Sequence, residues 1–195
     1  MRKIISKEEK DKKIRRNQLI IGGILILIMI FGYGAISLNN KGDTTEEDRI
    51  KYNGIDFIKD NSGYWYFEIQ GQQFIIINNP ENISKINFLS TLNLNYYSNK
   101  PLYFVGDIGE GSSEISRNLI DRFVLRIQQA CLYEKECKGN FPIKNCSNDN
   151  IIIFKEALNN ETETMYQEEN CVFIFAQYEN QSKYADKFLF NLLGI

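Results

Sequence analysis

The chain has 195 residues, and its 23 Lys and Arg against 25 Asp and Glu give a formal net charge of −2 at pH 7. This balance argues against nucleic acid as a partner, because nucleic-acid binding requires a basic face. The absence of histidine excludes Ser-His-Asp and Cys-His catalysis, and it removes the imidazole ligand of most catalytic zinc sites.

The N-terminal region carries the pattern of a membrane anchor. Residues 17–40 contain no charged side chain and directly follow a cationic stretch, Lys12-Lys13-Ile14-Arg15-Arg16. The apolar centre, 19–38, has the length of roughly 20 residues that a helix needs to span a bilayer. Since positive charge stays on the cytoplasmic side, we expect residues 1–16 to form a basic cytoplasmic tail. Residues 17–40 are expected to form a transmembrane helix that contacts the lipid bilayer through residues 19–38, with the rest of the chain outside the cell.

Two alternatives for this segment start from its ends. Ala35-Ile36-Ser37 fits the cleavage site of a signal peptide, but the apolar run exceeds the about 7–15 residues usual for one. Arg16-Asn17-Gln18 stands where a pilin-like leader would end, but the polar run 39–43 interrupts the continuous helix of a pilin. A retained anchor is the favoured interpretation.

The first half of the outer region carries strand patterns. Gly71 lies between the second and third of them and marks a hairpin turn. Asn79 followed by Pro80 is the pattern of a helix start, with Asn79 as the cap. Residues 86–92 alternate as in a further strand. The three runs rich in aromatic and β-branched residues are 55–58, 64–69 and 73–77.

Aromatic residues in this half are candidates for a sugar- or peptide-binding surface. Alternation places Tyr64 and Tyr66 on one face of a strand and Trp65 and Phe67 on the other, so at most one set is free for a partner. The alternative is a role in the core or in a sheet ladder, and the same choice applies to Tyr96 and Tyr97.

The second half alternates strands with helices. A short buried strand is expected over 102–105, and a helix begins at Ser112 or Ser113 and runs to about residue 134. The apolar face of this helix includes Ile115, Leu119, Phe123, Ile127 and Ala130.

Two later apolar runs, 151–154 and 172–176, are typical of strands buried on both faces or covered by helices. A last helix is expected from Ser182. We therefore predict a polar linker over 41–49 and one extracytoplasmic α+β domain over 50–195, with a mixed sheet and two main helices.

A glycine-rich loop between a strand and a helix is the candidate ligand site. Such a loop can cradle an anion on helix amide groups. The loop lacks the lysine of a P-loop, and its two acids would repel phosphate, so an ordinary strand-to-helix turn is the alternative. The residues concerned are Gly106, Asp107, Gly109, Glu110 and Gly111.

The four cysteines, Cys131, Cys137, Cys146 and Cys171, all follow the apolar segment. An even number of cysteines outside the cell indicates two disulfides, with three possible connectivities. We predict Cys137–Cys146 as a local loop and Cys131–Cys171 as a link from the helix to a strand. A four-cysteine zinc site is the alternative, but the gaps are wider than the usual two to four residues.

Acidic residues provide the remaining catalytic hypothesis, since a glycosidase needs two convergent carboxylates. Asp56, Glu68, Asp107 and Glu110 are available, but nothing in the sequence brings two of them together.

The chain also contains four Asn-x-Ser/Thr sequons, which are glycosylation sites if the host modifies them. Asn160 lies in a polar loop and is the most accessible by expectation. The four asparagines are Asn82, Asn145, Asn160 and Asn180.

The sequence identifies no catalytic residue, metal site or cofactor. It favours a membrane-anchored, non-enzymatic module that binds or assembles with another envelope protein. The alternatives are a carboxylate-dependent envelope hydrolase and an accessory subunit of a larger membrane complex.

Overall fold

A computed structural model describes the chain in two units. In the first unit, residues 17–18 and 20–27 are helical. Within the described part of the chain, no helix combines the length and the hydropathy that a membrane crossing requires. The predicted tail, most of the predicted span and almost all of the linker lie outside the described residues, so they stay predictions. The described residues are 17–18, 20–27, 49–158 and 160–195.

The second unit begins with a four-stranded antiparallel sheet in which the strands follow chain order. Gln70 and Gly71 join β3 to β4 with positive φ angles of 52° and 74°, as a two-residue hairpin turn requires. The predicted hairpin is therefore confirmed, whereas β1 was not foreseen. The strands are β1 (Arg49–Tyr52), β2 (Ile55–Lys59), β3 (Trp65–Ile69) and β4 (Gln72–Ile76).

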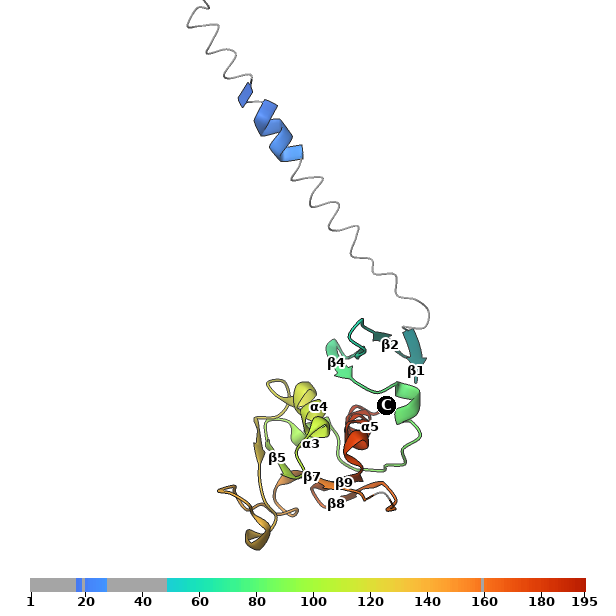
Figure 1. Ribbon diagram of the computed structural model, residues 1–195, viewed down its shortest axis with the longest axis vertical. Coiled ribbons are helices and arrows are strands. Elements are labelled where there is room, and N and C mark those ends of the chain that lie inside the picture. The colour runs from blue at the N-terminus through green and yellow to red at the C-terminus, as the bar shows by residue number, and fades with distance from the viewer. Residues whose placement is uncertain (1–16, 19, 28–48, 159) are drawn as a thin grey trace, which may run out of the picture. The chain divides into compact units, whose positions relative to one another are not determined.

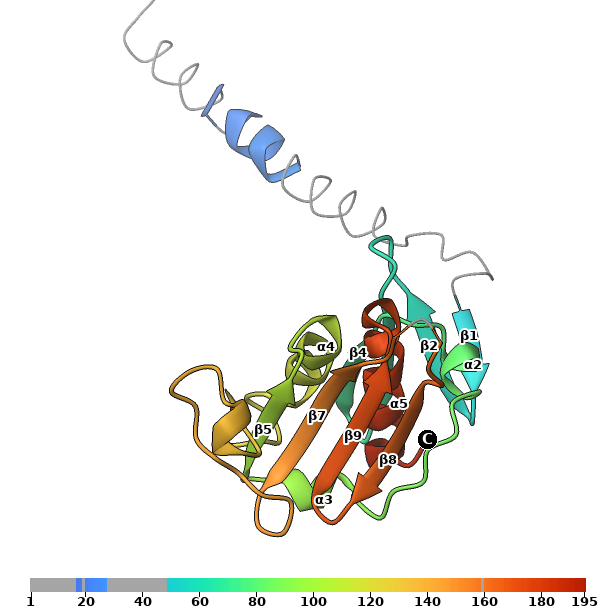
Figure 2. The same cartoon turned by 60° about the horizontal axis from the view of Figure 1, so that its bottom comes forward.

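A five-stranded mixed sheet follows, in the order β6-β5-β7-β9-β8. Figure 2 shows β5, β7, β9 and β8 side by side in this order. Its first four strands are parallel, and β8 pairs antiparallel to β9 at the edge. The expected α+β fold with a mixed sheet is thereby confirmed. The strands are β5 (Pro101–Gly106), β6 (Arg126–Gln129), β7 (Asn150–Glu156), β8 (Thr164–Glu168) and β9 (Cys171–Ala176).

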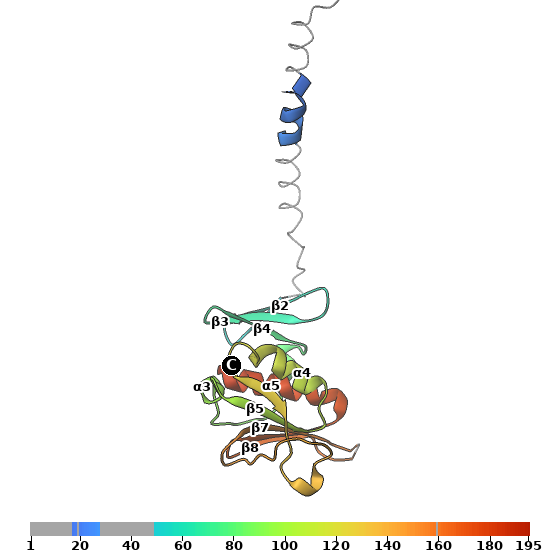
Figure 3. The same ribbon diagram turned by 90° about the vertical axis from the view of Figure 1, so that its left-hand side faces the viewer.

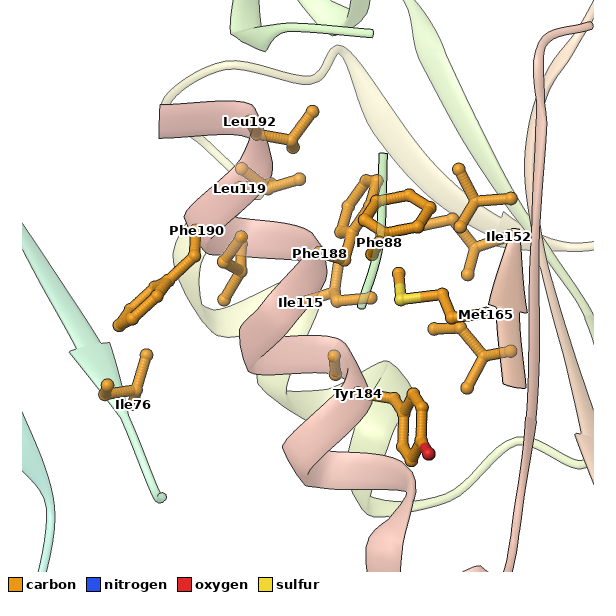
Figure 4. Close-up of a cluster of buried hydrophobic side chains, with 14 of the residues drawn as sticks. Ile76, Phe88, Ile115, Leu119, Ile152, Met165, Tyr184, Phe188, Phe190 and Leu192 are labelled. Atoms are coloured by element: carbon orange, nitrogen blue, oxygen red, sulfur yellow. The ribbon is translucent and has the colours of Figure 1, made fainter. Parts of the chain in front are cut away.

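Two helices, α4 (Glu110–Leu119) and α5 (Gln181–Leu193), lie between the two sheets (Figures 1 and 3). On α5, Phe190 points toward Ile76 of the antiparallel sheet, while Phe188 lies on the side of Ile152 in the mixed sheet (Figure 4). A helix that is apolar on most of its circumference is stable only when buried on both sides, which explains the three layers.

Short helical segments complete the fold. Asn79 caps α2, since its side chain accepts the amide of Glu81 at 2.8 Å, and Pro80 is the first helical residue. The predicted cap is confirmed. The segments are α2 (Pro80–Ile83), α3 (Leu94–Tyr97) and the 3-10 turns η2 (Glu134–Glu136) and η3 (Tyr178–Asn180).

The helix predicted to run from residue 112 to about residue 134 is wrong in its second half. It ends at Leu119, because Ile120 is extended and Asp121 has a positive φ of 59°. Ile127 then belongs to β6, which pairs parallel with β5. Leu119, Phe123 and Ile127 are four residues apart, and this spacing is compatible with a helix and also with a turn followed by an edge strand. Backbone pairing with β5 favours the strand.

The strand predicted over 86–92 is also wrong. This segment contains no strand; instead Phe88 and Leu92 insert into the core. The backbone amide of Thr91 donates to the side chain of Gln167 on β8 at 2.8 Å. The strand that does form at this edge of the mixed sheet is β8, whose polar sequence carried no clear strand signal.

The open edge of β4 is closed by a side chain from α4. Asn118 accepts the amide of Ile75 at 2.9 Å and donates to the carbonyl of Ile75 at 2.7 Å. Its carboxamide thereby takes the place of a neighbouring strand, which explains why an asparagine is 1% exposed at this position.

Candidate functional site

The mixed sheet has one face on the helices and one face turned away from them, which we call the outer face. Leu102, Ile152 and Val172 belong to the main core on the helix side. Tyr103, Ile151 and Cys171 belong to a second, smaller apolar cluster. Because side chains alternate along a strand, these neighbouring positions face opposite sides of the sheet. The outer face is therefore apolar, although none of the described helices covers it.

A hollow of about 590 Å³ lies on this outer face. Its floor is one rung of the sheet, since Val105 pairs with Ile153, Ile153 with Phe173, and Phe173 with Tyr166. The rings of Tyr166 and Phe173 are stacked, with centroids 4.8 Å apart and planes 7° apart. Tyr166 remains 46% exposed, so the floor presents an aromatic surface to solvent.

The next rung on the same face, toward the carboxyl ends of the parallel strands, carries a positive charge. Lys155 of β7 pairs with Phe175 of β9, which pairs with Thr164 of β8. The Lys155 ammonium lies 5.5 Å from the centroid of the Phe175 ring. The hollow is thus apolar on its floor and cationic at this rim.

A second hollow of about 350 Å³ continues the first. The two share Val105, Gly106, Asp107 and Leu132 in their linings. Together they form one long depression, which we call the groove. It lies where the chain leaves β5 toward β6 through α4 and returns to β7 along the outer face. Such reversals at the carboxyl ends of parallel strands are the usual ligand crevices of open sheets.

The wall of the groove is the segment 130–149, and two disulfides hold it. Cys131–Cys137 closes a loop within the segment, and Cys146–Cys171 ties the segment to β9. The expectation of two disulfides is confirmed, but the predicted pairing is wrong. Cys131 follows an edge strand rather than lying on a helix, and the amide of Asn170 donates to the carbonyl of Cys146 at 3.0 Å, which places Cys146 beside Cys171.

Loss of the two disulfides is expected to have unequal effects. In the chain-entropy model, removing the 25-residue link Cys146–Cys171 lowers the free energy of unfolding by about 3.5 kcal/mol, and removing the six-residue link Cys131–Cys137 lowers it by about 2 kcal/mol. Chemical denaturation of the two double-alanine variants without reductant measures both values. Non-reducing peptide mapping that recovered Cys137 joined to Cys146 would contradict this connectivity.

The predicted ligand loop divides into two parts. Gly106 and Asp107 line the groove, and the Asp107 carboxylate accepts the amide of Glu156 at 3.2 Å. Gly109 and Gly111 instead serve packing, because a Cβ at these positions would meet the ring of Tyr178 at 2.8 Å and the ring of Phe154 at 2.8 Å.

Glu110, the remaining acid of this loop, is exposed in the first turn of α4. Gly106 and Asp107 thus contribute one end of the groove, and an anion-binding role of the loop stays a prediction.

The four carboxylates considered for catalysis are not brought together as one group. Asp56 and Glu68 are exposed on the antiparallel sheet, while Asp107 and Glu110 lie at the end of β5. In the described part of the chain, no cluster of three or more acidic or cysteine side chains could hold a metal ion.

A carboxyl pair that the sequence did not reveal lies between the two helices. Glu114 of α4 and Asp186 of α5 are both 0% exposed. Arg117 donates to Glu114 Oε2 at 2.6 Å, while Asn78 donates to Asp186 Oδ2 from its backbone at 3.0 Å and from its side chain at 2.8 Å. The other oxygen of each carboxyl group receives no hydrogen from any other described residue.

A shared proton accounts for these two oxygens. Burial raises the pKa of Asp186 well above its ordinary value of 3.8, and the adjacent Glu114 raises it further. Burial also raises the pKa of Glu114, but the Arg117 guanidinium lowers it. The proton therefore resides on Asp186, which donates it to the Glu114 carboxylate. Neither residue lines the hollows on the outer face of the mixed sheet.

The aromatic candidates follow the predicted alternation. Trp65 and Phe67 are buried in the core, whereas Tyr64 and Tyr66 are half-buried. The strand face that carries Tyr64 and Tyr66 is partly covered by another side chain, since the Arg117 guanidinium lies 5.0 Å from the centroid of the Tyr64 ring. Tyr97 is fully buried and Tyr96 is 38% exposed. Trp65, Phe67 and Tyr97 therefore build the core, as the alternative interpretation expected, and a binding role of Tyr64, Tyr66 and Tyr96 stays a prediction.

The sequon asparagines differ in accessibility. Asn82, Asn145 and Asn160 are exposed, while Asn180 is half-buried and donates its amide to Glu163 at 2.8 Å. Three of the four can therefore meet an enzyme without local unfolding, and their modification stays a prediction.

The sequence did not reveal the groove, because its lining residues come from four strands that lie side by side only in the folded domain. The continuous apolar runs of β7 and β9 were a signal that both faces of the sheet are apolar, but not that one face stays open. Comparison with known protein families, with curated proteins and with solved structures finds no match to this chain.

Proposed function

We propose that the chain is a single-pass membrane protein whose outer domain, 50–195, is a non-enzymatic binding module. Its ligand is an extended apolar segment of another envelope protein, bound in the groove. The observation that carries this proposal is the apolar rung of Val105, Ile153, Phe173 and Tyr166, which lines the larger hollow on a sheet face that no described helix covers. Apolar-lined hollows are the usual binding sites of protein domains.

The shape of the groove favours a segment over a compact molecule. The larger hollow alone falls within the range of about 300–1,000 Å³ that small ligands occupy. The second hollow extends it past Leu132 to Lys138 and Phe141, so a compact ligand would leave half of the groove empty. An extended chain with alternate apolar side chains would fill both.

Localisation outside the cell rests on two independent features. The cationic tail before the apolar segment favours a cytoplasmic N-terminus, and residues 19–38 are long enough to cross the bilayer. All four cysteines are paired in disulfides, which persist in oxidising compartments.

The hydrolase alternative has less support. A glycosidase needs two carboxylates that face a cleft at a defined separation. The close pair in this domain, Glu114 and Asp186, is enclosed between the helices, and Asp107 is the acid that lines both hollows of the groove. A single carboxylate beside an apolar floor is better suited to binding than to hydrolysis.

Site-specific cross-linking in intact membranes tests the proposal. A photoreactive phenylalanine analogue in place of Tyr166 is expected to cross-link to one envelope protein, and mass spectrometry is expected to locate the contact in an apolar segment. Val105→Arg, which fills the groove with a charged side chain, is expected to reduce the cross-linked product at least tenfold.

Leu125 provides the matched control, because it is 67% exposed and lies outside the groove. Leu125→Arg should leave the product unchanged. A product that persists with Val105→Arg, or that forms equally from an analogue at position 125, would refute the groove as the binding site.

A further inference from the structure

A third hollow, of about 290 Å³, lies at the opposite end of the mixed sheet from the groove. It opens at the start of β5 and β7 and before β9, and we call it the amino-end pocket. It shares no lining residue with the groove. Its lining is mainly polar, whereas that of the groove is mainly apolar. The polar residues of the lining include Tyr96, Lys100, Asn148, Asp149, Asn150 and Asn170.

Asn150 is the residue that marks this pocket as a binding site. It is 6% exposed, and its backbone is held in the sheet opposite Leu102. Its side-chain carboxamide makes no hydrogen bond to another described residue, and neither of its polar atoms is among the buried atoms that lack a partner, so both atoms reach solvent. The group is therefore available to a ligand as a donor and an acceptor.

Neighbouring side chains are held in position by the protein itself. Asn170 accepts the hydroxyl of Tyr96 at 2.7 Å and donates to the carbonyl of Ser147 at 3.1 Å. Asp149 accepts the ammonium of Lys144 at 3.0 Å. Because these hydrogen bonds lie within the protein and fix the side chains, binding would order little of the protein.

The remaining free groups include both donors and acceptors. The Asn148 amide donates to Asn145 at 3.1 Å, which leaves its carbonyl oxygen as an acceptor. Lys100 contributes an ammonium that lies 4.6 Å from the centroid of the Tyr96 ring. Asn150 contributes a donor and an acceptor in one group.

We propose that the amino-end pocket binds a single sugar ring, as a free monosaccharide or as the end of a glycan. A ligand must offer hydroxyl groups that both donate and accept over a small body, and a sugar has this chemistry. The volume is near the lower limit of about 300 Å³ for ligand pockets, which fits one ring rather than several. The polar lining disfavours an apolar ligand.

Saturation-transfer NMR on the full chain in lipid nanodiscs tests this proposal with glucose, galactose, mannose and N-acetylglucosamine as probes. At least one sugar is expected to receive saturation. Asn150→Leu, which keeps the side-chain size, and Lys100→Ala, at an exposed position, are each expected to weaken binding at least tenfold. Lys100→Ala keeps the test valid if Asn150→Leu does not fold.

Asn95→Leu is the matched control, because Asn95 is exposed on the neighbouring α3 but does not line the pocket, and its affinity should equal that of the unaltered chain. Transfer to none of the four sugars overturns the proposal. So does binding that survives both pocket substitutions, or transfer to free amino acids in place of the sugars.

Discussion

Gly106→Ala is expected to lower the free energy of unfolding by about 4 kcal/mol, one of the two largest single-residue effects we predict. Gly106 ends β5 with a φ of +90°, and a Cβ there would stand 2.0 Å from the carbonyl oxygen of Phe154 on β7. That oxygen is backbone, so contact can be relieved only by separating two paired strands. The cost combines the strain of the positive φ with the steric overlap. Thermal denaturation should show a fall of roughly 10 °C in Tm.

Gly63→Ala separates the two contributions. Gly63 also has a φ of +90°, but no atom lies within 4 Å of a Cβ at this position. Its substitution carries only the backbone strain and is expected to cost about 1–2 kcal/mol. Equal losses in the two variants would show that β5 and β7 are not in close contact at the mouth of the groove.

Asp186→Asn is expected to raise the free energy of unfolding at pH 7 by about 1–4 kcal/mol, because a neutral isostere replaces a carboxyl group whose ionisation is disfavoured by burial. The asparagine amide can donate to Glu114 in place of the shared proton, and its carbonyl can accept from Asn78. Urea denaturation across the pH range from 4 to 8 measures the difference between the two proteins.

The sign of the pH dependence follows from the raised pKa of Asp186. The unfolded chain releases this proton near pH 3.8, whereas the folded chain keeps it to a much higher pH. Stability is therefore fully present below pH 3.8 and is lost as the pH rises through the folded pKa. Asp186→Asn should remove this decline relative to the unaltered protein.

Glu114→Gln is the matched control for the carboxyl pair. It leaves Arg117 without its carboxylate partner, so it is expected to lower stability at neutral pH. A stabilising effect of Glu114→Gln, together with no effect of Asp186→Asn, would mean that the proton resides on Glu114.

Local signals in the sequence predicted the elements whose residues interact mainly with near neighbours. The hairpin at Gly71 and the cap at Asn79 depend on two to four adjacent residues, and both formed as expected. The strands at 151–154 and 172–176 and the helix from Ser182 formed within two residues of the predicted bounds, because long apolar runs have few alternatives.

Elements at the sheet edges were the ones that failed. The apolar residues around β6 have helical spacing, and the residues of β8 are mostly polar. Neither segment therefore has a sequence pattern that predicts a strand. Each becomes a strand because the neighbouring strand, β5 or β9, offers unpaired backbone groups. The disulfide pairing failed for the same reason, since it assumed a helix where β6 lies.

The sequence by itself determined the fold class, the even count of cysteines and the exclusion of histidine chemistry, because these depend on composition and local pattern. The tertiary structure alone decided the groove, the amino-end pocket and the buried pair of Glu114 and Asp186. Each of these joins residues from strands or helices that are distant in the chain. Which side chains meet there depends on strand order and register, and neither can be derived from a short stretch of sequence.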